Sequence, residues 1–334
     1  MDVQISAISY WLPEQVLTNE EINRNHPTWE IEKTSIKTGI RERRVAGEQS
    51  TGDLAYMAAV QLFNEHKIAP DLIDFVLLCT QTPDFFLPTT ACILQNRLGL
   101  KKSCGALDVG LGCSGYVYCL GLAKGLVQSG SARNVLLITA DTLTKLLHKD
   151  DKSSIPLFGD AATATLVSCE QKGIKIGNCV YGSDGEGANN LIVKNGANKH
   201  KPMDGIDIYD NENEFVRNDN NLYMDGTEIF KFTASNVPPL IKRVLEQNML
   251  SRDEVDLFVF HQANKYMLDF VRKKIGIEPS KFFYHLERSG NTTSSTIPIA
   301  LKEAMIQNKM TSNSKVVLAG FGVGYSWAAC VLGN

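Results

Sequence analysis

The chain has 334 residues, of which 43% are hydrophobic, so it can bury one large core or two moderate ones. Its formal net charge of -3 argues against general nucleic-acid binding. The eight cysteines lie mostly inside apolar runs and show no metal-site spacing, which predicts reduced thiols in a cytoplasmic protein without a metal. We expect neither a signal peptide nor a membrane span, because no apolar run has the required length or flanks.

The first elements follow from local patterns. Residues 3–10 predict a strand, and a short helix should open near Thr18 with Asn19 as its cap. The basic segment 37–44, broken by Gly39, has the charge pattern of a solvated turn.

The next three segments predict a helix, a strand and an exposed loop. Residues 51–66 carry the apolar stripe of an amphipathic helix, and 74–80 form an apolar run typical of a buried parallel strand. The loop 82–88, which includes Leu87, exposes large apolar side chains. Another surface should cover that loop, and we expect a dimer for this reason.

An apolar run that begins at Gly105 ends in a turn of small residues carrying Cys113. Residues 116–128 have apolar positions at helical spacing, so Cys113 should lie between a strand and a helix. The positive end of that helix macrodipole favours a thiolate, and Gly112 and Gly115 permit close backbone approach. By itself this pattern also fits a buried structural thiol.

The second half of the chain repeats the element order of the first. The apolar run at 74–80 has a counterpart that begins at residue 256, and the run at 134–138 has one that begins at residue 315. The offsets are 182 and 181 residues, which indicates a duplicated strand-helix unit.

This duplication predicts an N-terminal half, residues 1–170, that carries Cys113, and a C-terminal half, residues 171–334. Asn291 follows Cys113 by 178 residues, so the two should head equivalent helices. The segment 182–225, rich in Gly, Asn and Asp, predicts a long surface excursion between the halves.

Two polar residues of the second half are candidates for the same site as Cys113. His261 ends a predicted buried strand, which is where open α/β sheets place ligands, although a single histidine there fits a core residue equally. Asn291, in Gly-Asn-Thr-Thr-Ser-Ser, by itself predicts only an Asx cap. Cys113, His261 and Asn291 should all lie on one face of the sheet. A thiolate with two neutral donors suits acyl transfer and stabilisation of an enolate.

Six motifs in order carry a resemblance, nearly end to end, to the beta-ketoacyl-acyl-carrier-protein synthase III family of thiolase-fold condensing enzymes. They are Lys37-Thr-Gly-Ile-Arg-Glu-Arg43, Gly112-Cys-Ser-Gly115, Phe158-Gly-Asp160, His261-Gln-Ala-Asn264, Gly290-Asn-Thr292 and Phe321-Gly-Val-Gly-Tyr-Ser-Trp327. The resemblance implies a thiolase-like α/β fold of five layers, αβαβα, from two duplicated halves. It also implies a homodimer and a catalytic triad of Cys113, His261 and Asn291.

The resemblance further implies the reaction. Cys113 would take an acyl primer from acyl-CoA, and His261 and Asn291 would hold the thioester carbonyl of malonyl-acyl carrier protein during decarboxylation. The product would be a 3-oxoacyl-acyl carrier protein that initiates fatty-acid synthesis, with no cofactor. The amides of Cys113 and Val323 would form the oxyanion hole. Relatives that make esters or amides carry an acidic residue at the position of Asn291, so asparagine favours carbon-carbon bond formation.

The resemblance also assigns substrate contacts. Where the family holds CoA with a tryptophan and arginines, this chain has Lys33, Lys37 and Lys152, and Tyr266 replaces an arginine near the tunnel mouth. Lysine keeps the charge but cannot stack as a planar group, so CoA is held differently or the primer arrives on a carrier protein. Other implied substrate contacts are Phe158, Met224, Gly226, Asn264 and Phe321. Leu87 is the implied determinant of primer length across the dimer.

The basic residues implied to bind the acyl carrier protein are Lys231, Arg272, Lys273 and Lys274. Two alternatives stay open at this point. One is a specialised condensing or acyl-transfer enzyme of the same fold, in a secondary-metabolite or surface-polysaccharide pathway. The other is a non-catalytic partner of an active synthase, which the presence of all three triad residues disfavours.

Overall fold

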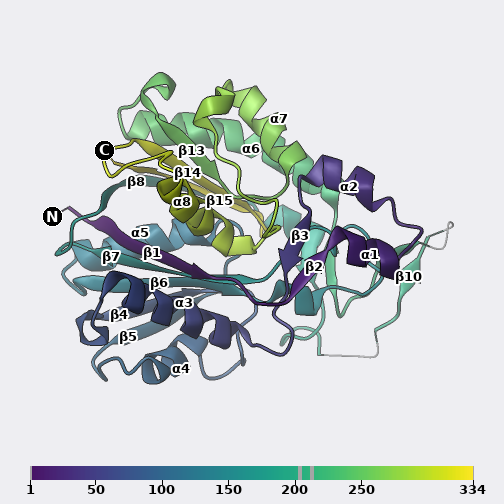
Figure 1. Ribbon diagram of the computed structural model, residues 1–334, viewed down its shortest axis with the longest axis horizontal. Helices are drawn as coiled ribbons and strands as arrows, with labels where there is room; N and C mark the ends of the chain where they lie inside the picture. The colour runs from purple at the N-terminus through teal and green to yellow at the C-terminus, as the bar shows by residue number, and fades with distance from the viewer. Residues whose placement is uncertain (1, 202–204, 211–213, 334) are drawn as a thin grey trace.

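The computed structural model describes residues 2–201, 205–210 and 214–333. Its central feature is a sheet with the strand order β13-β14-β15-β8-β1-β7-β6-β4-β5 (Figure 1). The strands of this sheet are β1 (Gln4–Trp11), β4 (Phe75–Cys79), β5 (Gly105–Val109), β6 (Asn134–Asp141), β7 (Ala161–Ser168), β8 (Ile174–Ser183), β13 (Leu257–Phe260), β14 (Val316–Gly322) and β15 (Ser326–Leu332).

The helices and the small strands surround this sheet. The helices are α1 (Asn19–Asn25), α2 (Ile31–Thr38), α3 (Thr51–His66), α4 (Thr90–Arg97), α5 (Gly115–Gln128), α6 (Gly226–Gln247), α7 (Lys265–Ile275) and α8 (Thr296–Ile306). The short strands pair as β2 (Val16–Thr18) with β3 (Glu42–Arg44), β9 (Leu191–Val193) with β12 (Leu222–Met224), and β10 (Ile208–Tyr209) with β11 (Phe215–Arg217).

The strand pairing repeats between the two halves. In the first half, β4 runs parallel to β5 and β6, and β7 runs antiparallel between β6 and β1. In the second half, β13 runs parallel to β14 and forms a parallel bridge at Phe282, and β15 runs antiparallel between β14 and β8. A short β1–β8 ladder joins the two sets. We therefore propose the division into residues 1–170 and 171–334 as two duplicated units.

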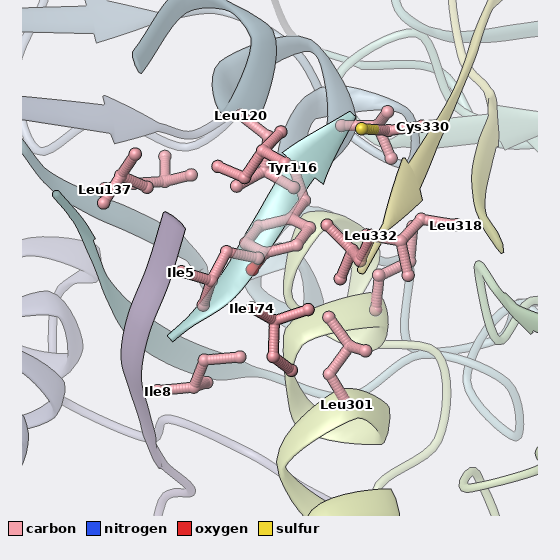
Figure 2. Close-up of a cluster of buried hydrophobic side chains, with 14 of the residues drawn as sticks. Ile5, Ile8, Tyr116, Leu120, Leu137, Ile174, Leu301, Leu318, Cys330 and Leu332 are labelled. Atoms are coloured by element: carbon pink, nitrogen blue, oxygen red, sulfur yellow. The ribbon is translucent and has the colours of Figure 1, made fainter. Parts of the chain in front are cut away.

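The helices form three layers around these strands, which gives the predicted αβαβα order. In Figure 1, α3 and α4 lie on one outer side, α6 and α7 on the other, and α5 and α8 between the two sets of strands. Figure 2 shows the core around α5 and α8, where Tyr116, Leu120 and Leu301 meet Ile5 from β1 and Leu318 from β14. This central layer holds the N-termini of α5 and α8 close to the same strand ends.

Two local predictions differ from the structure. Thr18, not Asn19, caps α1, because a capping box with Glu21 satisfies the first amides of the helix. The segment 37–44 is not a solvated turn, since it ends α2, turns at Gly39 with φ 74° and continues as β3. Arg43 in β3 is fully buried.

The segment 182–225 also differs from its prediction. It begins inside β8, so it lies within the second half rather than between the halves. It contains the β9–β12 ladder, and both strands contribute side chains to the wall of an internal cavity. The described part of this segment is therefore a cover over the interior, not only a surface excursion.

Candidate active site

Cys113, His261 and Asn291 line one internal cavity of about 300 Å³. Cys113 lies between β5 and α5, His261 directly follows β13, and Asn291 precedes α8. Their exposed fractions are 7%, 2% and 4%, so bulk water has little access to any of them. The duplicated topology brings these three strand-end positions together, as the sequence predicted.

The thiol of Cys113 is held against two backbone amides. It accepts hydrogen bonds from the N–H groups of Val323 and of Cys113 itself, and both lower its pKa. Burial acts more strongly and, with the negative charge of Asp141, raises the pKa of Cys113 to about 12. Burial therefore opposes the predicted thiolate at the helix end and favours the neutral thiol. The same two amides are placed to bind an oxyanion formed at the thioester carbon.

Glycines permit this close approach. A β-carbon on Gly115 would stand 2.2 Å from the Cys79 sulfur, and one on Gly112 would stand 2.0 Å from an oxygen of Gln81. The predicted need for small residues around Cys113 is confirmed at these two positions.

His261 is a neutral imidazole. Burial lowers the pKa of His261 to about 3, against a smaller opposite effect of the Thr293 carbonyl. Its Nδ1 atom lies 2.7 Å from the hydroxyl oxygen of Thr296, which also lies 3.0 Å from the Thr293 carbonyl oxygen. That hydroxyl has a single proton: given to Nδ1, it leaves the ring proton on Nε2 as a hydrogen-bond donor, and given to the Thr293 carbonyl, it leaves the ring proton on Nδ1.

Asn291 is fixed through its backbone and its side chain. Its N–H donates to the Leu157 carbonyl at 2.9 Å, and its carbonyl accepts from the Gly159 N–H at 3.1 Å. Its side-chain oxygen accepts from the Thr293 N–H at 3.0 Å, which is an Asx turn and not the predicted Asx cap, since Ser295 is the N-cap of α8. Because that oxygen is engaged, the amide nitrogen of Asn291 is the group available as a donor in the cavity.

The remaining predicted contacts of the inner cavity lie where expected. Phe158, Met224, Gly226, Asn264, Phe321 and Val323 all line it. Asn264 also caps α7 through a hydrogen bond from the Met267 N–H at 2.8 Å. The apolar wall from Leu191 to Val193, with Leu222, was missed, because a segment rich in Gly and Asn gave no sign that it folds over the interior.

A larger outer cleft of about 930 Å³ continues from the cavity. The two share Leu157, Met224, Gly226, Asn264 and Met267, so they adjoin one another. Lys37, Lys152 and Lys231 line the cleft.

The cationic groups of the cleft have acidic or aromatic neighbours. Lys152 pairs with Glu214, and Lys231 pairs with Glu228 at 2.7 Å. The Lys37 ammonium lies 5.5 Å from the centre of the Tyr266 ring. Lys33 is not brought together with these residues, since it pairs with Glu30 and lines a separate cavity beside Trp29.

The other predicted binding residues lie on the surface. Leu87 is 86% exposed and does not line the cavity of its own chain. On α7, Arg272 donates to the Ile277 carbonyl and Lys274 to the Ala234 carbonyl, whereas Lys273 is exposed.

The described residues, 2–201, 205–210 and 214–333, hold neither a candidate metal site nor a membrane-spanning helix. They contain no group of three or more His, Cys, Asp or Glu side chains placed to hold a metal ion. None of their helices is long and apolar enough to cross a membrane.

A duplicated five-layered fold with a cysteine-bearing turn ahead of its central helix defines a thiolase-fold condensing enzyme, which is an acyltransferase. The family model for 3-oxoacyl-[acyl-carrier-protein] synthase III matches residues 107–185, and the model for the C-terminal part of that synthase matches residues 245–333. The chain belongs to the 3-oxoacyl-[acyl-carrier-protein] synthase III family.

Individual relatives cover the whole chain. A beta-ketoacyl-[acyl-carrier-protein] synthase III of Clostridium perfringens is 34% identical over 334 residues, which is 99% of each chain. The crystal structure of a 3-oxoacyl-(acyl-carrier-protein) synthase III is 48% identical and superposes with a TM-score of 0.96 over 100% of both chains. The synthase III of Thermus thermophilus is 34% identical, with a TM-score of 0.86 over 99% of each chain.

Proposed function

We propose that this protein joins an acyl primer, carried as a thioester on Cys113, to malonyl-acyl carrier protein and so initiates fatty-acid synthesis. The observation that carries this proposal is the convergence of Cys113, His261 and Asn291 on one buried cavity that adjoins a larger cleft. Full-length similarity to synthases of this family supports the choice of substrates.

In the first step, the Cys113 sulfur attacks the carbonyl of an acyl-CoA. The sulfur-carbonyl bond to CoA breaks, and the thiol proton leaves on the departing CoA thiol. The amides of Cys113 and Val323, which already contact the sulfur, hold the oxyanion of the tetrahedral intermediate. The apolar wall of the cavity encloses the acyl chain.

In the second step, malonyl-acyl carrier protein enters through the cleft and loses carbon dioxide. The electron pair of the broken bond moves toward the thioester oxygen, and the donors of His261 and Asn291 stabilise that charge. Because both groups are neutral, neither transfers a proton to the carbanion outright. The carbanion attacks the acyl carbonyl, and the Cys113 sulfur leaves and recovers a proton.

We also propose the assembly, partners and location. A homodimer is supported by Phe86 and Leu87, exposed by 80% and 86%, beside the edge strand β5 with its half-exposed Leu107. Lys231, Arg272, Lys273 and Lys274 are proposed to meet the acyl carrier protein, and Lys33, Lys37 and Lys152 to meet CoA. Eight free cysteines support a cytoplasmic location, and no cofactor is proposed.

Intact-protein mass spectrometry after incubation with a series of acyl-CoAs tests the first step. We expect one acyl adduct that is lost in Cys113→Ala, followed by transfer to malonyl-acyl carrier protein as a 3-oxoacyl product. If no CoA ester acylates the protein while acyl-carrier proteins do, the donor assignment is wrong. If no thioester of either kind acylates Cys113, the function itself is wrong.

A further inference from the structure

The proposed donor Asn291 depends on one neighbour, Thr293. The Thr293 N–H donates to the side-chain oxygen of Asn291, which is what leaves the amide nitrogen facing the cavity. Thr293 adopts φ 52°, a left-handed conformation that is unfavourable for a β-branched residue. Such strain persists only where surrounding contacts enforce it, and it tends to occur at functional sites.

Asp141, at the end of β6, provides that enforcement. Its carboxylate accepts hydrogen bonds from the Thr293 hydroxyl and, at 2.9 Å, from the Ser294 hydroxyl. Asp141 is fully buried, yet no cation is within ion-pair distance of it among the described residues. Burying a carboxylate without a cationic partner costs free energy, which indicates that Asp141 has a specific role.

The other oxygen of Asp141 faces the loop after β4. It accepts from the Gln81 N–H at 2.7 Å and from the hydroxyls of Thr80 and Thr82 at 3.3 and 3.4 Å. Asp141 therefore ties the first half of the chain to the loop that carries Asn291 in the second half. Gln81 and Thr293 both line the inner cavity, so this junction is part of its wall.

We propose that Asp141 and Thr293 are positioning residues for Asn291. Asp141 holds Thr293 in its left-handed conformation, and the Thr293 N–H then sets the side chain of Asn291 so that its amide nitrogen points at the enolate oxygen. This positioning role belongs to malonyl decarboxylation and is separate from the effect of the Asp141 charge on the pKa of Cys113. This inference rests on the proposed function, since it needs a malonyl thioester in the cavity.

The chain offers a matched control in Thr292. It lies in the same loop and is 1% exposed, but its hydroxyl has no hydrogen-bond partner in the part of the chain that the structure describes. Thr292→Val and Thr293→Val make the same chemical change at adjacent buried positions. Only the second removes a hydrogen bond to Asp141. Thr293→Ser keeps that hydroxyl and provides a conservative rescue.

The experiment measures the two half-reactions separately in the full-length protein. Release of labelled carbon dioxide from malonyl-acyl carrier protein reports decarboxylation, and mass spectrometry reports acylation of Cys113. For Thr293→Val we expect decarboxylation to fall about tenfold to a hundredfold, because small misplacements of a catalytic group have effects of this size. Acylation should stay within about twofold, and Thr292→Val and Thr293→Ser should stay near the wild type.

A double-mutant cycle separates positioning from general damage. In an Asn291→Ala background, Thr293→Val should change decarboxylation by less than about twofold, because the group that it positions is already absent. Asp141→Asn should lower decarboxylation in the wild-type background and likewise lose its effect with Asn291→Ala.

Three results would overturn the inference. They are equal effects of the two valine variants, an equal loss in both half-reactions, or an undiminished effect of Thr293→Val in the Asn291→Ala background. Wild-type protein that is acylated but releases no carbon dioxide would instead remove the proposed function and the inference with it. The melting temperature of each variant shows whether it is folded.

Discussion

The sulfur of Cys113 lies directly against the backbone of Gly322. A β-carbon on Gly322 would stand 2.7 Å from both the Sγ and the Cβ of Cys113, closer than real β-carbons approach other atoms. The end of β14 and the turn before α5 are thus packed with no room for a methyl group. We expect Gly322→Ala to displace the thiol from the amides of Cys113 and Val323.

The expected result is a loss of Cys113 acylation of at least about tenfold, measured by mass spectrometry over time. Gly125→Ala is the control, because a β-carbon there would meet nothing within 4 Å. That control should retain its acylation rate and gain up to about 1 kcal/mol of stability from helix propensity. An unchanged rate in Gly322→Ala would contradict the proposed contact.

The pKa of Cys113 predicts how its alkylation depends on pH. Burial raises the pKa of this thiol to about 12, so the thiolate fraction should keep rising with pH through about pH 7 to 10. We expect the rate of reaction with iodoacetamide to rise without a plateau in that range. Asp141→Asn removes a negative charge that raises this pKa, so it should shift the profile to lower pH. A plateau below about pH 9 in the wild type would show that Cys113 is a thiolate.

The lowered pKa of His261 predicts that the stability of the protein depends on pH. Burial lowers the pKa of His261 to about 3 in the folded protein, below the ordinary value near about 6.5 of an unfolded chain. Between these values the unfolded chain binds a proton that the native protein does not. Stability should therefore fall as the pH falls through this window, by at most about 1.4 kcal/mol per pH unit from this group.

His261→Gln should make the unfolding free energy less steep between about pH 4.5 and 6.5, as measured by denaturant titration. An identical slope for the wild type and His261→Gln would mean that His261 is protonated in the native protein.

The side chain of Leu87 is expected to limit the length of the primer. If its exposed side chain enters the cavity of the partner chain, Leu87→Phe should narrow that cavity. We expect acylation by acyl-CoAs of about six to ten carbons to fall at least about tenfold relative to acetyl-CoA. Leu72→Phe, another exposed position, should leave the ratio unchanged. A wild type that accepts only acetyl-CoA would contradict this role.

Lys273 tests the carrier-protein surface. It is exposed on α7, whereas its neighbours Arg272 and Lys274 donate to backbone carbonyls. We expect Lys273→Glu to raise the KM for malonyl-acyl carrier protein about threefold to tenfold, with an effect that weakens at high salt and leaves kcat unchanged. Lys102→Glu, at an exposed position before β5, serves as the charge-matched control. Equal effects of both variants would remove the assignment.

Local sequence patterns were enough to locate several elements and to single out Cys113, His261 and Asn291 as candidates. Apolar runs and helical spacing located β4, α3 and α5, because burial of one face leaves a periodic pattern in the chain. The duplication placed Cys113 and Asn291 at the starts of equivalent helices, and His261 was visible as a polar residue at the end of an apolar strand. These are local or repeated signals, so one chain is enough to detect them.

The environment of these residues depends on long-range packing, which no local pattern shows. The thiol of Cys113 is neutral because burial outweighs the local amides, and burial depends on the whole fold. Asp141 and Thr293 are 152 residues apart in the sequence but form a hydrogen bond, and no local pattern marks them as partners. The wall formed by Leu191 to Val193 comes from a polar segment that folds back over the interior. Local propensity fixes which segments are helices and strands, whereas long-range packing fixes the charge and shape of the site that they enclose.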